Sequence, residues 1–153
     1  MVVVAPAELK HIKPLAVLLE EMDRHYGTSE FESFDRRVAQ ITDALFGPIP
    51  AAFALLAWED EQLVGLASYS FLWPAVGVTR SLYLKELYVA QARRRKGIGK
   101  RLMDSLFEVA STHGCSRVEW TTDEDGRSAQ RFYEELDIPV NAGKLFYRVE
   151  LAG

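Results

Sequence analysis

Cysteine and histidine are scarce in this sequence, and long apolar runs are missing. The 153 residues include one cysteine, Cys115, which cannot form an internal disulfide, and three histidines that lack the spacing of metal ligands. No apolar run approaches the ~20 residues that a membrane-spanning helix needs, and the start at Met1–Val4 has no basic region typical of a signal peptide. We therefore expect a cytoplasmic protein that binds no metal and enters no membrane.

Charge is distributed unevenly along the chain. The 18 basic and 22 acidic residues give a formal net charge of −4, which argues against a general nucleic-acid-binding protein. Six of the 18 basic residues fall within nine positions, from Arg93 to Arg101, so that 12 basic residues face 22 acidic ones in the remainder. We expect an anionic ligand at the basic cluster and a cationic one elsewhere.

Composition and periodicity predict one globular domain over residues 1–153. Hydrophobic residues make up 48% and charged residues 26% of the chain, as in average globular proteins. Helical spacing of apolar residues, with Pro14 as a start or a kink of the first helix, and shorter apolar runs predict the order β-α-α-β-β-β-α-β-α-β. This order predicts an α+β sheet with helices on both faces. The expected helices cover 7–26, 35–46, 97–113 and 128–136, and the expected strands cover 2–4, 52–58, 63–71, 81–89, 117–122 and 144–151.

The turn Arg94-Arg95-Lys96-Gly97-Ile98-Gly99 joins an expected strand to an expected helix. Gly97 and Gly99 have no side chains, so that backbone N–H groups there can approach a ligand closely. The first turn of a helix also carries unpaired N–H groups and the positive end of its dipole, and such a turn binds phosphate. The third glycine of a dinucleotide fingerprint and the Gly-Lys-Ser/Thr triplet of an NTP-binding loop are both missing. The alternative is a solvated basic helix start without a ligand.

After the strand Leu84–Val89, the pattern Arg94-x-x-Gly97-x-Gly99 resembles motif A of the GNAT superfamily of N-acetyltransferases. The stretch Phe132–Leu136 resembles the second conserved helix of that superfamily, and the order of elements is similar to the GNAT layout over essentially the entire chain. Within the superfamily, Gly65–Phe71 and Ser81–Val89 resemble the diamine N-acetyltransferase group. The resemblance implies a mixed, mostly antiparallel sheet with splayed central strands and helices on both faces.

The resemblance also implies acetyl-CoA as cosubstrate, without a metal. The pantetheine arm is expected beside the end of the strand, like an added strand, with the pyrophosphate on the backbone amides of the turn. A backbone N–H near Leu87 or Tyr88 is expected to donate to the acetyl carbonyl oxygen. The implied cofactor-binding residues are Leu87, Tyr88, Val89, Arg94, Arg95, Lys96, Gly97, Ile98, Gly99 and Lys100.

Two side chains are implied as catalytic groups for direct attack of an amine on the thioester. An alkyl ammonium has a pKa near ~10.4 and must lose a proton, while the leaving thiolate must gain one. Tyr133 matches the proton donor of the family, and the alternative is a tyrosine that packs beside Phe132. Glu86 is the nearby carboxylate for the base, and a water-mediated base is the alternative.

Strand alternation places Leu84, Glu86 and Tyr88 on one face and Lys85 on the other, unless a β-bulge re-aims Glu86. The position of Lys85 is commonly acidic in the diamine group, and Gly126 stands where the family often has asparagine. An acidic stretch near the expected acceptor side could steer a cationic amine. Its members are Glu20, Glu21, Asp23, Glu30 and Glu32.

The leading hypothesis is therefore acetyl transfer from acetyl-CoA to a primary amine of a small cationic acceptor, either a polyamine or an amino-acid-like molecule. One alternative is acetylation of a protein N-terminus or lysine. Another is a non-catalytic acyl-CoA-binding sensor domain, which the departures at Lys85 and Gly126 would fit. Because many GNAT proteins dimerise, the resemblance also implies a homodimer.

Overall fold

The computed structural model describes residues 1–152, and the chain divides into two compact units. The first unit is Met1–Thr121 and the second begins at Thr122. The sheet and three helices belong to the first unit, and one helix belongs to the second. The expectation of a single domain stays a prediction.

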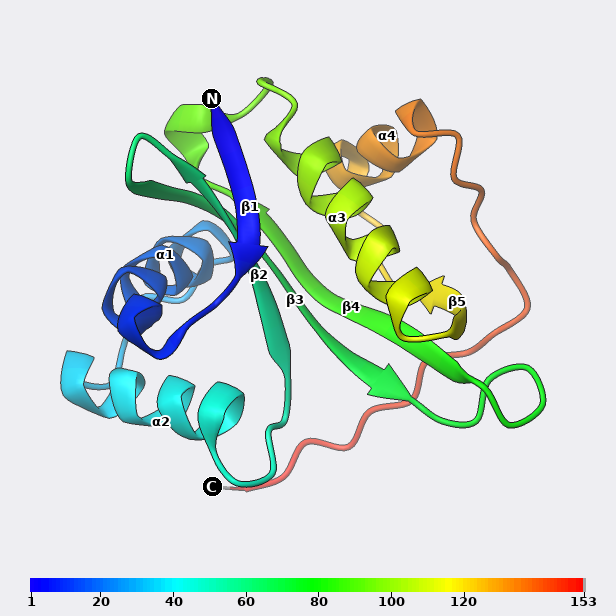
Figure 1. Cartoon of the computed structure of the whole chain (residues 1–153), viewed down its shortest axis with the longest axis horizontal. Helices are drawn as coiled ribbons and strands as arrows, with labels where there is room; N and C mark the ends of the chain where they lie inside the picture. The colour runs from blue at the N-terminus through cyan, green and yellow to red at the C-terminus, as the bar shows by residue number, and fades with distance from the viewer. Residues whose placement is uncertain (153) are drawn as a thin grey trace. The chain divides into compact units, whose positions relative to one another are not determined.

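The first unit is built on a five-stranded mixed sheet with the order β1-β2-β3-β4-β5 (Figure 1). The strands β1 to β4 pair antiparallel with one another, and β5 pairs parallel with β4. The mixed, mostly antiparallel sheet expected from the sequence is therefore confirmed. The strands are β1 Val2–Pro6, β2 Phe53–Glu59, β3 Gln62–Leu72, β4 Arg80–Val89 and β5 Cys115–Glu119.

Four α-helices and two short 3-10 turns complete the fold. The helix α1 begins at Ile12, so Pro14 occupies its first turn, where the missing N–H removes no helical hydrogen bond. The sequence left a start or a kink open at this proline, and the structure shows the start. Within residues 1–152, no helix is both long and apolar enough to cross a bilayer. The elements are η1 Leu9–His11, α1 Ile12–His25, α2 Phe34–Phe46, η2 Gln91–Arg93, α3 Ile98–Thr112 and α4 Arg127–Glu135.

Helices cover both faces of the sheet in the first unit, as expected. On one face, Leu18 of α1 belongs to a buried cluster with Leu66 of β3. On the other face, Ile98 and Leu102 of α3 approach the backbone of Gly65. Figure 1 shows α1 and α2 on one side of the sheet and α3 on the other. The two faces of the sheet therefore bury separate sets of apolar side chains.

The strands β4 and β5, at one end of the described sheet, pair over only part of their length. Their register runs from Arg80 opposite Cys115 to Tyr83 opposite Glu119. From Leu84 to Val89, β4 is paired with β3 on one edge, and none of the described residues forms a ladder with its other edge. This is the splay between strands that the family resemblance implied, and it leaves backbone groups of β4 open to an added strand or ligand.

The strand expected over residues 144–151 is wrong in this structure. Residues 144–152 form no strand, and the side chains of Leu145, Tyr147, Val149 and Leu151 are between 80% and 88% exposed. A strand needs a neighbouring edge for its ladder of hydrogen bonds. The apolar pattern of residues 144–151 therefore indicates only that the segment can form a strand where a neighbouring strand edge is available.

Candidate functional site

The turn between β4 and α3 has two left-handed positions, Arg95 with φ 66° and Gly97 with φ 79°. Gly97 is the N-cap of α3, and the carbonyl oxygen of Gly97 accepts the first helical bond from the N–H of Arg101 at 3.1 Å. A Cβ added at Gly97 would meet nothing within 4 Å, so glycine is needed here for its backbone conformation. The N–H groups of residues 98–100 lie in the first turn and have no helical partner. The sequence thus forms a helix start that favours an anion.

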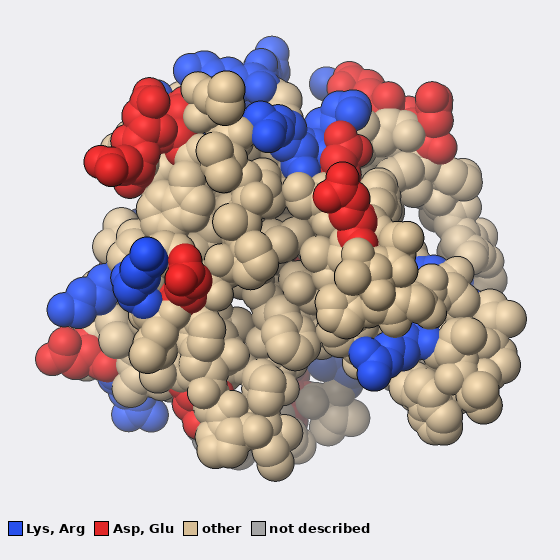
Figure 2. Space-filling model, in the orientation of Figure 1, with Lys and Arg blue, Asp and Glu red and all other residues tan. Residues whose placement is uncertain are grey.

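Basic side chains gather over this turn, at the top of the view in Figure 2. Arg93 is a structural member of the cluster, because its Nε lies 3.0 Å from Glu59 and its guanidinium donates to Gln62 at 3.0 Å. These contacts tie η2 to the hairpin between β2 and β3. Arg95 and Lys96 are exposed, and within the described chain neither forms an ion pair. Their charge therefore remains available for a bound anion.

Arg94 and Lys100 have partners within the protein. The Nε of Arg94 donates to the carbonyl oxygen of Val89 at 3.1 Å, and its guanidinium lies 5.2 Å from the centre of the Tyr88 ring. Lys100 forms an exposed ion pair with Asp104 at 3.0 Å, one helical turn further on. An exposed pair of this kind contributes little free energy and is easily exchanged for a ligand. Both cations stay predictions as cofactor-binding residues.

A β-bulge in β4 decides which way Glu86 points. Ser68 of β3 lies opposite Glu86, and the next residue, Tyr69, lies opposite Leu84, so Lys85 is an extra residue in the ladder. Directly opposed residues share a face of the sheet, and Ser68 and Tyr69 occupy opposite faces. Leu84 and Glu86 therefore lie on opposite faces. The prediction from unbroken alternation, which places Leu84 and Glu86 on one face, is wrong here. The alternative, a β-bulge that re-aims Glu86, is present.

The face that carries Glu86 is the face covered by α1. Leu66 lies opposite Tyr88, two residues further along each strand, and both are buried in the cluster that includes Leu18 of α1. Glu86 is half-buried on this side, whereas Lys85 is exposed. A carboxylate is thus held beside the open edge of β4, on the face toward α1.

Tyr88 and Glu21 connect β4 to α1. Tyr88 is 2% exposed, and its hydroxyl donates to Oε2 of Glu21 at 2.5 Å. Burial and then the neighbouring Glu21 carboxylate raise the pKa of Tyr88 to about 12. The same carboxylate oxygen accepts the backbone N–H of Gln91 at 3.2 Å. Sequence reasoning missed this role of Glu21, although its spacing from Leu18 places it on the buried side of the helix.

Other members of the acidic stretch are neutralised by arginines. Glu20 pairs with Arg24 at 2.9 Å, and Asp23 pairs with Arg37 at 3.0 Å. The guanidinium of Arg24 also lies 4.6 Å from the centre of the Phe31 ring, in the loop between α1 and α2. These carboxylates are therefore engaged in holding the loop, which weakens the expected steering of a cation.

The second unit contains α4 and the tyrosine expected as the acid. Gly126 is the N-cap and offers no side chain, and the side-chain amide of Gln130 donates instead to the carbonyl oxygens of Asp123 and Glu124, both at 2.9 Å. Tyr133 is half-buried, and its ring meets that of the preceding phenylalanine edge-on at 5.1 Å. Its role as proton donor stays a prediction.

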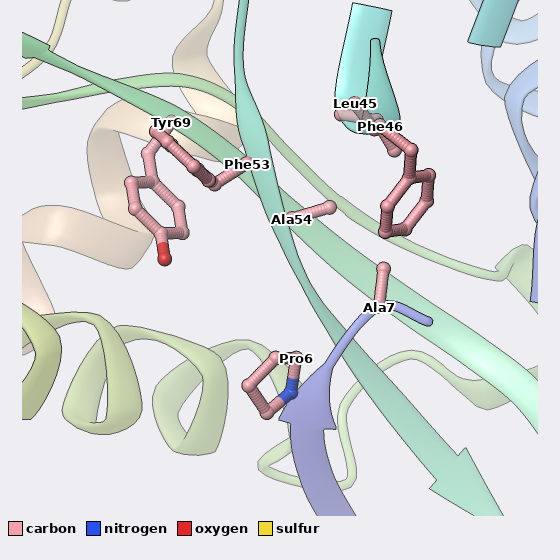
Figure 3. Close-up of a pocket in the computed structure, with 7 residues that line it drawn as sticks. All are labelled: Pro6, Ala7, Leu45, Phe46, Phe53, Ala54 and Tyr69. Carbon is pink, nitrogen blue, oxygen red and sulfur yellow. The ribbon is translucent and has the colours of Figure 1, made fainter. Parts of the chain in front are cut away.

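A small cavity in the first unit lies away from the turn. It measures about 80 Å³, and its lining side chains are apolar except for the hydroxyl of Tyr69, whose pKa is raised by burial. Ligand pockets usually measure roughly 300–1,000 Å³. Figure 3 shows its lining residues, which are Pro6, Ala7, Leu45, Phe46, Phe53, Ala54 and Tyr69. The open edge of β4 and the turn after it are the better candidate site.

An open strand edge that leads into a basic helix start is an arrangement suited to an extended ligand with phosphate groups. Residues 16–138 match the profile of the acetyltransferase (GNAT) family. The chain belongs to this family, and it is an N-acetyltransferase. Members of the family use acetyl-CoA as the acetyl donor, which agrees with the site. The GNAT fold and the enzyme class expected from the sequence are confirmed.

Named relatives include N-acetyltransferases of amino-acid-like molecules. The chain is 28% identical over 127 residues to a D-amino-acid N-acetyltransferase of Saccharomyces cerevisiae, covering 78% of each chain. It is 28% identical over 137 residues to a thialysine N-epsilon-acetyltransferase of Mus musculus, covering 80% of each. Among solved structures, an integron cassette protein from the mobile metagenome of V. cholerae has a TM-score of 0.90 and 28% identity, covering 97% of this chain and 92% of that one.

Proposed function

We propose that this enzyme acetylates a primary amine of a small cationic acceptor, either amino-acid-like or a polyamine, by direct attack on acetyl-CoA. The observation that carries the proposal is the half-buried Glu86 carboxylate beside the open edge of β4, on the face toward α1. A carboxylate there attracts an ammonium group and can take its proton. Relatives that act on D-amino acids and on thialysine support an acceptor of this class.

The residues of the first unit fit the donor. Acetyl-CoA, when bound, supplies an acetyl group activated as a thioester. The unpaired edge of β4 offers N–H and C=O groups to an extended arm, and the N–H groups at the start of α3 offer donors to phosphates. Arg95 and Lys96 add free positive charge. The proposed contacts are Leu87, Tyr88, Val89, Arg94, Arg95, Lys96, Gly97, Ile98, Gly99 and Lys100.

Each proposed catalytic group either transfers one proton or stabilises the negative charge that develops on the carbonyl oxygen. Glu86 accepts a proton from the acceptor ammonium, directly or through a water, because the amine must be neutral to attack. A backbone N–H near Leu87 or Tyr88 donates to the carbonyl oxygen as negative charge develops on it. Tyr133 donates its phenolic proton to the departing sulfur. The assignment of Tyr133 rests on the match of its helix to the family pattern.

A panel of amines tested for thiol release from acetyl-CoA identifies the acceptor class. We expect turnover with diamines or basic amino acids, and a decrease of kcat by about 100-fold in Glu86→Gln and in Tyr133→Phe. Tyr147→Phe is the matched control, because Tyr147 is 82% exposed. Full activity of Tyr133→Phe across pH would refute the assigned acid. Binding of acetyl-CoA without turnover on any amine would favour the sensor domain.

The proposal extends to a cytoplasmic homodimer. The single cysteine supports the cytoplasmic location, and the dimers common in the family support the homodimer. Light scattering of the purified protein at several concentrations tests the dimer, and a mass of one chain throughout would refute it.

A further inference from the structure

The short turn η2, which precedes the basic turn, has no capping side chain of its own. Its N-cap is Ala90, whose methyl group accepts no hydrogen bond. The first N–H groups of a helical turn need acceptors from elsewhere. Glu21 of α1 provides one, because its Oε2 accepts the N–H of Gln91 at 3.2 Å. A residue distant in sequence therefore caps the segment that leads into the candidate phosphate site.

The same oxygen of Glu21 also holds the end of β4. It accepts the hydroxyl of Tyr88 at 2.5 Å, so one carboxylate joins α1, β4 and η2. The ring of Tyr88 in turn lies 5.2 Å from the guanidinium of Arg94, whose Nε donates to the carbonyl oxygen of Val89. The position of the first residue of the basic turn is thus connected through the tyrosine ring to Glu21.

The charge of Glu21 opposes the ligand of this turn. A carboxylate close to a site for pyrophosphate repels it, so on electrostatic grounds alone the loss of Glu21 would strengthen binding. Geometry predicts the opposite, because the loss of both hydrogen bonds frees η2 and the buried tyrosine hydroxyl. The two effects differ in sign, which makes them separable by experiment.

We propose that Glu21 is a positioning residue for acetyl-CoA, which holds Tyr88 and caps η2 so that the turn from Arg94 to Gly99 keeps its phosphate-binding shape. The inference rests on the proposed function, because it assumes that acetyl-CoA occupies this turn. It assigns a role in donor binding to the helix that covers the face of Glu86.

Calorimetric titration of Glu21→Ala and Glu21→Gln with acetyl-CoA tests this role. The glutamine keeps an oxygen acceptor and removes the charge, so we expect affinity equal to that of the wild type or higher. The alanine loses both bonds, and we expect a Kd and a KM for acetyl-CoA about five- to tenfold higher, with kcat little changed. Glu20→Ala is the control, because Glu20 is the neighbouring acid and its ion pair, among residues 1–152, is with Arg24.

Wild-type affinity or tighter binding in Glu21→Ala would overturn the role. If that variant does not fold, Tyr88→Phe decides, because it loses one of the two bonds and keeps the cap of η2. Unchanged affinity in Tyr88→Phe would then overturn the part of the role that acts through Tyr88, and weaker binding would support that part. Failure of the wild type to bind acetyl-CoA would refute the proposed function and this role together, whereas wild-type binding with an unaffected Glu21→Ala refutes this role alone.

Discussion

Gly65 lies on β3 opposite Val89, the last residue of β4, and beneath the first turns of α3. A Cβ at this position would lie 3.1 Å from Cδ1 of Leu102, 3.2 Å from the carbonyl oxygen of Tyr88 and 3.4 Å from Cγ2 of Ile98. Carbon atoms pack best at roughly 3.5–4.0 Å. In Gly65→Ala the neighbours must therefore move by a few tenths of an ångström.

Two free-energy terms oppose each other in Gly65→Ala. Overpacking a buried site costs about 1–3 kcal/mol. Alanine recovers about 0.5–1 kcal/mol, because it loses less backbone entropy than glycine on folding. Leu102 can adjust its side chain, but the carbonyl oxygen of Tyr88 is backbone and moves only with β4. We expect a net loss of about 1–2 kcal/mol in the free energy of unfolding, together with weaker binding of acetyl-CoA at the displaced end of β4.

Urea denaturation of the wild type and Gly65→Ala measures the stability term, and calorimetric titration with acetyl-CoA measures the second. The pair Ser70→Ala and Ser70→Gly, on the same strand, provides the alanine-versus-glycine difference without the contact to α3. If Gly65→Ala were as stable as the wild type or more stable, the predicted overpacking against α3 and β4 would be refuted. Backbone entropy alone predicts such an increase in stability.

Three further predictions concern a buried phenol, a strained hairpin and the basic turn. Because the folded-state pKa of Tyr88 is about 12 against an ordinary value of 10.0, the neutral phenol stabilises the fold below pH 10, and this contribution is lost as pH rises toward 12. Urea titrations at pH 9, 10 and 11 measure how much more stable the wild type is than Tyr88→Phe. This difference should fall progressively above pH 10, and the whole loss on ionisation of Tyr88 should be about 2–3 kcal/mol. A constant difference would contradict the prediction. Glu61 has φ 66° in the hairpin turn, so Glu61→Gly should raise the unfolding free energy by about 1 kcal/mol, and a lower melting temperature would count against it. Arg94→Ala should raise the Kd for acetyl-CoA about tenfold and Lys100→Ala less than about threefold, because a forked guanidinium can donate two hydrogen bonds to a phosphate whereas an ammonium acts as a point charge. Calorimetry that reverses this order would exclude the proposed arrangement.

The fold could be predicted where it depends on local periodicity. The apolar stripe of α3 and the short apolar runs of β2 and β3 indicate their elements directly, and the observed bounds differ from the expected ones by a residue or so. The strand over residues 144–151 could not be settled in this way, because pairing depends on a neighbouring edge. The bulge at Lys85 depends on the register between β3 and β4, which alternation along one strand does not contain.

In the candidate site, too, features formed by neighbouring residues could be predicted, and features formed by residues distant in sequence could not. The turn from Arg94 to Gly99 could be found from neighbouring residues alone, since its glycines and its charge are adjacent in the chain. Glu21 could not, because the hydrogen bond to Tyr88 joins residues 67 positions apart. Arg93 resembles its basic neighbours in sequence, and only its contacts with the hairpin residues Glu59 and Gln62 distinguish it.

The bulge at Lys85 divides β4 into two stretches that obey different constraints. Residues Arg80–Leu84 have neighbours on both edges for most of their length, so substitutions there test the sheet itself. From Glu86 onward one edge is open, while the side chain of Tyr88 stays packed in the core, so the open feature of this stretch is its backbone. Deletion of Lys85 would restore a regular ladder without turning either stretch over, because Leu84 and Glu86 would then be consecutive residues and would stay on opposite faces. The face on which Glu86 lies is thus set by its register with Ser68 of β3, and the extra residue lets β4 reach that register from the opposite face at Leu84.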